Sequence, residues 1–119
     1  MTERQERLAR VDLATAGGTT VVSVIGEHDL STAPQLRQEL VELDSQRLVV
    51  LDFAQCTFID STVLGVLASA SRRLAQRGGR LIGTQAKGIV RNALRVTGMA
   101  DLLLEVDATA LLDGRERVD

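Results

Sequence analysis

The sequence predicts a single α/β domain with a mixed, mostly parallel sheet of about four to five strands and about four helices. Apolar runs that read as strands alternate with amphipathic stretches over the later part of the chain. This order favours parallel strands joined by right-handed crossovers. The length of 119 residues suits one domain. A composition of 45% hydrophobic and 25% charged residues is that of a globular protein.

Five runs of apolar residues predict the strands. Leu48-Val49-Val50-Leu51 is unbroken and reads as a strand that is buried on both faces. Gly17-Gly18 predicts a hairpin turn between the first two strands. The expected strands are residues 8–14, 21–25, 48–51, 81–83 and 102–106.

Four stretches predict the helices. Thr32 and Gln35 have the spacing of a capping box, and the glycines after residues 77 and 97 are expected helix stops. The helix after Asp60 carries one apolar stripe, formed by Val63, Val66, Leu67, Ala70 and Leu74. In the third helix the residues expected to face inward are Ile89, Val90, Ala93 and Leu94. The expected helices are 32–43, 60–77, 87–96 and 107–112, within a domain at 8–112 between flexible ends at 1–7 and 113–119.

Composition and charge argue against several classes of function. The formal net charge is −2 and aromatic residues make up 2%, so the chain has neither the basic surface nor the stacking platforms of a nucleic-acid-binding protein. No apolar run approaches the roughly 20 residues of a membrane span. The N-terminus is too charged for a signal sequence. These features predict a cytoplasmic domain that binds neither nucleic acid nor membrane.

Few residues are available for catalysis. The sequence has one His and one Cys, no spacing that suits zinc and no phosphate-binding glycine loop. We therefore expect no enzyme activity, no metal and no cofactor. His28 is expected to be a solvated loop residue, and Cys56 a small core residue. The arginines at 72, 73, 77 and 80 are expected to form a solvated helix end.

The strand-to-helix turn at Asp60-Ser61-Thr62 is the strongest candidate site. In one interpretation, Asp60 or Ser61 is simply the N-cap, which stabilises a helix by about 1 kcal/mol. In the other, Ser61 accepts a phosphate, which would bring roughly −1.5 to −2 charge to a helix N-terminus beside Asp60. The fold would survive this charge, whereas a surface docked over the turn would be repelled. The two interpretations are compatible, because a cap can also be a switch.

Three segments resemble the anti-sigma factor antagonists, the bacterial branch of the STAS domains. Phe58–Leu67 is similar to the phosphorylation signature of that family. Gly26–Pro34 resembles an earlier Gly-Glu-x-Asp segment, and Arg91–Met99 resembles a later helix with its glycine stop. The resemblance runs from about residue 8 to residue 112. It implies that the unphosphorylated protein binds an anti-sigma factor that is also a serine kinase, that phosphorylation ends this binding, and that a serine phosphatase restores it.

The resemblance also assigns roles to residues. It implies phosphorylation of Ser61, and whether Thr62 is also modified stays open. Val63 stands where the family usually has Gly, and a β-branched side chain beside Ser61 is expected to narrow the approach of a kinase. No cofactor is implied. The implied partner-binding residues are Asp29, Ser31, Asp60, Thr62, Val63 and Leu64.

Two other functions stay open. A phosphorylation-independent STAS subunit of a signalling scaffold or a transporter would bind partners through the same turn. A two-component receiver is also a small α/β domain, and Asp52 at the end of a buried strand resembles its phosphate acceptor. Against a receiver, no acidic pair ends an early strand to hold magnesium, and no Lys follows the last strand.

Overall fold

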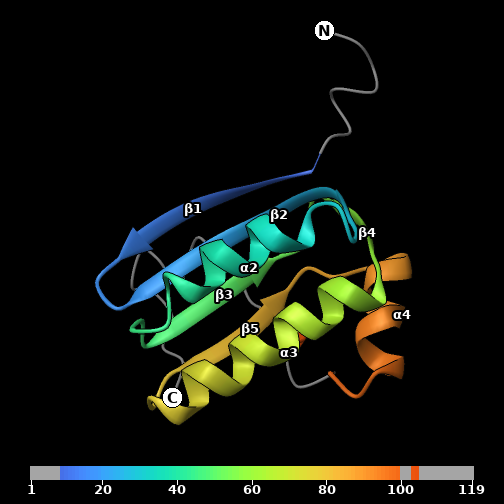
Figure 1. Ribbon diagram of the computed structural model, residues 1–119. Helices are drawn as coiled ribbons and strands as arrows, with labels where there is room; N and C mark the ends of the chain where they lie inside the picture. Colours follow the sequence, from blue (N-terminus) through green and yellow to red (C-terminus); the bar gives the residue numbers. More distant parts are fainter. Residues whose placement is uncertain (1–8, 100–102, 105–119) are drawn as a thin grey trace, which may run out of the picture.

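A computed structural model describes residues 9–99 and 103–104 of the chain. Its central sheet follows the order β1-β2-β3-β5-β6 (Figure 1). Strand β4 lies off this path and pairs with β2 beyond the point where β3 ends. The strands are β1 (Arg10–Ala16), β2 (Thr19–His28), β3 (Leu48–Asp52), β4 (Cys56–Ile59), β5 (Arg80–Thr84) and β6 (Leu103–Leu104).

The sheet is mixed rather than mostly parallel. Strand β1 runs antiparallel to β2, while the pairs β2–β3, β3–β5 and β5–β6 are parallel. The antiparallel edge follows from the hairpin at Gly17-Gly18, because a two-residue connection can join only antiparallel strands. Gly17 has a φ of 61°, the left-handed conformation that this turn requires.

The described residues contain three helices, not about four. They are α2 (Ala33–Val41), α3 (Ser61–Gln76) and α4 (Gly88–Val96). The helix expected at 107–112 lies outside the described residues, as do residues 102, 105 and 106 of the last expected strand. Within the described part of the chain, no helix has the length and apolar character needed to cross a bilayer.

Helices α2 and α3 lie side by side over one face of the sheet (Figure 1). The hydrophobic core is aliphatic apart from Phe53 and Cys56. The stripe predicted for α3 is confirmed at four of its five positions, Val63, Leu67, Ala70 and Leu74, which are buried. Val66 is only partly buried, because it faces the space between the two helices.

Helix α4 packs against β4. Val90 and Leu94 are buried as expected, but the expectation that Ile89 faces inward is wrong, since its side chain is 63% exposed. The glycine stops are confirmed. Gly78 and Gly98 follow α3 and α4 with φ values of 82° and 79°, and in both cases the next residue donates its N–H back to the last turn, as in a Schellman motif.

Candidate functional site

The sheet brings two loops to the same edge. Strands β2 and β4 are parallel, with His28 paired to Ile59. Since parallel strands end at the same edge of a sheet, the residues that follow them, Asp29 and Asp60, emerge next to each other. The short strand β4 was not expected from the sequence. It carries the chain from β3 along β2 and so places the start of α3 beside the loop that precedes α2 (Figure 1).

The loop after β2 is a hydrogen-bonded turn centred on Asp29. One carboxylate oxygen, Oδ1, accepts from both the N–H and the hydroxyl of Ser31, at 2.9 and 2.6 Å. These hydrogen bonds lower the pKa of Asp29, the Ser31 hydroxyl making the larger contribution. Asp29 therefore stays ionised and holds Ser31 in place.

Thr32 helps to close the same turn instead of capping α2 in the expected way. Its hydroxyl accepts from the Asp29 N–H at 3.0 Å and donates to the Asp29 carbonyl at 3.2 Å. Its side chain makes no cap hydrogen bond to the helix. The predicted capping box with Gln35 is therefore wrong, because the Thr32 hydroxyl is already engaged by the backbone of Asp29.

Asp60 is the N-cap of α3. Its Oδ1 accepts from the Val63 N–H at 2.9 Å, and its carbonyl accepts from the Leu64 N–H at 3.0 Å. Of the two caps considered, Asp60 or Ser61, the structure selects Asp60. Its backbone is extended, as an N-cap requires, whereas Ser61 is already the first residue of the helix.

Ser61 and Thr62 are both exposed at the start of α3. The side chains of Val63 and Leu64 turn inward and are only 1% and 9% exposed. Val63 therefore occupies the core and leaves the space over the Ser61 hydroxyl to solvent, contrary to the narrowing expected from its β-branched side chain. Of the residues implied for partner binding, Asp29, Ser31, Asp60 and Thr62 have accessible side chains, whereas Val63 and Leu64 fix the position of the helix.

His28 is buried, so the expectation of a solvated loop residue is wrong. It is the last residue of β2, its side chain is 2% exposed, and its Nε2 lies 3.0 Å from the Ile25 carbonyl. Burial lowers its pKa, an effect that the hydrogen bond to the Ile25 carbonyl only partly offsets. The imidazole is therefore neutral near pH 7 and serves as a packing residue directly beneath the two loops.

The remaining titratable candidates have structural roles. Cys56 is buried as expected, and burial raises the pKa of its thiol, which makes it unreactive. Asp52 accepts from the Ala54 N–H at 2.9 Å, so its carboxylate holds the turn after β3. Arg73 belongs to the expected solvated helix end but pairs with Asp44 at 3.1 Å. In the part of the chain that the structure describes, no three His, Cys, Asp or Glu side chains gather as metal ligands do.

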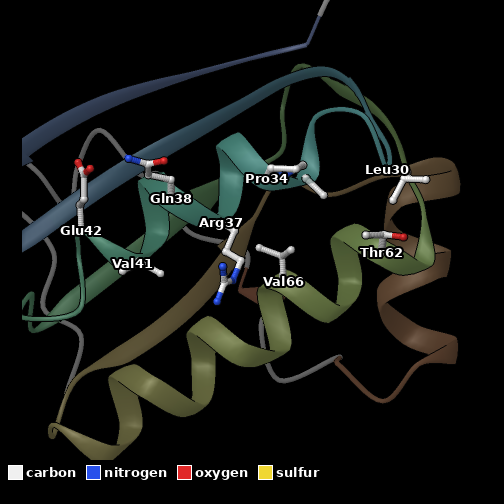
Figure 2. Close-up of a pocket in the computed structure, with 9 residues that line it drawn as sticks. Leu30, Pro34, Arg37, Gln38, Val41, Glu42, Thr62 and Val66 are labelled. Atoms are coloured by element: carbon white, nitrogen blue, oxygen red, sulfur yellow. The ribbon is translucent and has the colours of Figure 1, made fainter.

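A groove of about 690 Å³ lies between α2 and α3. It begins at Leu30 and Thr62, next to the Asp60-Ser61 turn, and follows the outer side of α2 to Glu42 (Figure 2). Sequence reasoning missed it. The available signal was a second stripe on the first helix, with Pro34, Gln38 and Val41 at helical spacing on its solvent side. The lining residues are Leu30, Ala33, Pro34, Arg37, Gln38, Val41, Glu42, Thr62 and Val66.

Comparison with known families decides the relationship of this chain. Residues 11–105 match the family model described as "Mlab, STAS domain". The chain belongs to the STAS domain family. The match spans the sheet and all three described helices.

Two relatives of this STAS domain are both named anti-sigma-B factor antagonists. The anti-sigma-B factor antagonist of Bacillus subtilis is 31% identical over 98 residues, covering 78% of this chain and 84% of the relative. The anti-sigma-B factor antagonist of Listeria monocytogenes is 30% identical over 84 residues, covering 69% and 74%. A crystal structure of an anti-sigma factor antagonist from Mycobacterium paratuberculosis superimposes with a TM-score of 0.77 at 27% identity, covering 92% of this chain and 97% of that one.

Proposed function

We propose that this STAS domain is an anti-sigma factor antagonist. Its unphosphorylated form binds an anti-sigma factor, which frees the sigma factor, and phosphorylation of Ser61 ends the binding. The relatives named anti-sigma factor antagonists support the role. The observation that carries the switch is the placement of Ser61, an exposed hydroxyl at the first position of α3, immediately after a capping carboxylate and beside the Asp29 turn.

A phosphate on Ser61 would act through charge rather than through unfolding. The helix N-terminus tolerates an added anion, and the cap is made by Asp60, not by the Ser61 hydroxyl. The phosphate would nevertheless stand among carboxylates at 29 and 60, making this edge of the domain strongly negative. A partner surface complementary to the unmodified turn would then meet roughly two more negative charges.

The partner surface that we propose consists of accessible groups at the two loops. Asp29, Ser31, Asp60 and Thr62 contribute side chains, while Val63 and Leu64 contribute by holding the first turn of α3 in the core. Thr62 is the neighbouring exposed hydroxyl and the alternative position for modification. The domain acts in the cytoplasm as a binding protein rather than an enzyme, comprises residues 8–112, and works with a serine kinase, the anti-sigma factor itself, and a serine phosphatase.

The decisive experiment is incubation of the purified protein with candidate kinase-type anti-sigma factors and ATP, followed by mapping of the phosphosite. We expect one phosphate on Ser61 and none on the Ser61→Ala protein. A phosphate that persists on Ser61→Ala and maps to Thr62 would show that Thr62 is modified as well. Ser61→Asp should bind the anti-sigma factor on the order of a hundredfold more weakly than the unmodified protein.

Ser45→Asp is the matched control, because it adds the same charge at an exposed serine in the turn after α2, remote from Ser61 in the chain. It should bind as the unmodified protein does. Equal binding by Ser61→Asp and the unmodified protein would refute the switch. Co-purification with a transport ATPase that Ser61→Ala leaves unchanged would instead establish the phosphorylation-independent subunit.

A further inference from the structure

We propose that the groove between α2 and α3 binds a small amphipathic anion, a carboxylate with a medium-length aliphatic chain. The groove is separate from the Ser61 hydroxyl, which does not line it. A volume of about 690 Å³ is within the range of small-molecule sites. Thr62 lines the groove and also belongs to the proposed partner surface, but decanoate binding is measured on the unmodified protein, so its outcome does not depend on phosphorylation of Ser61.

The walls of the groove suit an aliphatic chain. Five of the nine lining residues are apolar, and they come from both helices and from the loop before α2. Leu30 is 70% exposed at one end of the groove, so its side chain is accessible to a ligand there. Helix α2 has nine residues, about 13 Å at 1.5 Å per residue, and Arg37 is the fifth of them, so an aliphatic chain that runs from Arg37 to Leu30 lies along the first half of the helix.

Arg37 supplies the charge that selects an anion. Its side chain projects from α2 into the space opposite Val66 (Figure 2). Arg37 forms no ion pair with the residues that the structure describes. The ion pairs among those residues join Arg10 to Asp12 and Arg73 to Asp44. A guanidinium binds a carboxylate through two parallel hydrogen bonds. Glu42 is the carboxylate among the lining residues and competes with an anionic ligand for Arg37. It lies at the end of the groove opposite Leu30 and Thr62 (Figure 2).

These features orient the ligand. The carboxylate would pair with Arg37, and the chain would lie against Pro34, Val66 and Leu30, toward Thr62 and away from Glu42. The reverse orientation would move the ligand carboxylate to the Leu30 and Thr62 end of the groove, away from the Arg37 guanidinium, and would place the aliphatic chain beside the charged Glu42.

The test uses sodium decanoate with the full-length protein, by titration calorimetry and by NMR amide shifts. We expect saturable binding at one site per chain with a Kd at or below about 1 mM, and shifts concentrated on α2 and on the first half of α3. Decanol, which has the same chain without the charge, should bind at least about tenfold more weakly, which corresponds to about 1.4 kcal/mol.

Two variants separate the groove from general hydrophobic binding. Arg37→Glu should weaken decanoate binding about tenfold or more. Val41→Glu should also weaken it, because it places a carboxylate one helical turn from Arg37, where it competes with the ligand for the guanidinium. Both positions are exposed, so the fold should persist. Arg95→Glu, an equal charge reversal on the exposed side of α4, is the control and should bind decanoate normally. Absence of saturable binding, shifts spread over the whole domain, or equal binding by Arg37→Glu and Arg95→Glu would overturn the proposal.

Discussion

His28 and Ile59 are paired residues at the ends of two parallel strands, β2 and β4. This pairing makes the residues that follow them, Asp29 and Asp60, neighbours at one edge of the sheet, although they are 31 positions apart in the chain. Each of these carboxylates then organises its own loop, Asp29 through Ser31 and Asp60 through the Val63 N–H. The exposed Ser61 thus rests on two turns whose relative position the sheet determines.

Removal of the Asp60 cap should destabilise the domain. Asp60→Ala leaves the Val63 N–H without its partner at 2.9 Å, so the free energy of unfolding should fall by about 1 kcal/mol, within a range of about 0.5–2 kcal/mol. Urea denaturation measures the change. Asp60→Asn keeps an oxygen acceptor and should lose far less. If Asp60→Ala and Asp60→Asn were equally stable, the carboxylate would not be acting as the cap.

The Asp29 turn should be visible as a depressed pKa. Its hydrogen bonds from Ser31 favour the ionised form, so a carboxyl NMR titration should give a pKa below 3.8. Ser31→Ala removes the hydroxyl donor and should move the pKa back toward 3.8. Because the folded-state pKa is the lower one, the stabilisation from this turn is present above about pH 3.8 and is lost as the pH falls further. An unchanged Asp29 pKa in Ser31→Ala would contradict this account.

Local patterns predicted the buried strand at Leu48–Leu51, the stripe of α3 and the glycine stops, because each depends on residues near one another in sequence. What depends on long-range pairing escaped prediction. The strand Cys56–Ile59 has four residues and no clear alternation, and forms because β2 offers it an edge. His28 is buried because β2 continues past a register shift at Gly26 to reach that strand. Ile89 fits the spacing of an apolar helix stripe. However, α4 packs against β4 with a different side, which leaves the Ile89 side chain exposed.

Two glycines should respond in opposite ways to alanine. Gly78 terminates α3 with a φ of 82°, so Gly78→Ala forces a non-glycine residue into the left-handed region and should cost about 1–2 kcal/mol. Gly65 lies inside α3, and a Cβ there would meet nothing within 4 Å. Gly65→Ala should therefore stabilise the protein by about 0.5–1 kcal/mol. Thermal unfolding of the two variants measures both effects. A destabilised Gly65→Ala would show that this position needs glycine for a reason other than the helix.

The buried His28 should make the stability of the domain depend on pH in mildly acidic solution. Its pKa in the folded protein is lowered from 6.5 by burial, so below about pH 6.5 the unfolded chain takes up a proton that the folded protein does not. The free energy of unfolding should therefore decrease as the pH falls from about 7 to about 5, above the range in which most carboxylates titrate. His28→Gln, which retains an N–H donor toward the Ile25 carbonyl but has no titrating ring, should show a flatter profile in urea denaturation over the same range. Parallel profiles for His28→Gln and the unmodified protein would mean that another group is responsible, and that the imidazole beneath the two loops is not the proton-sensitive element of the fold.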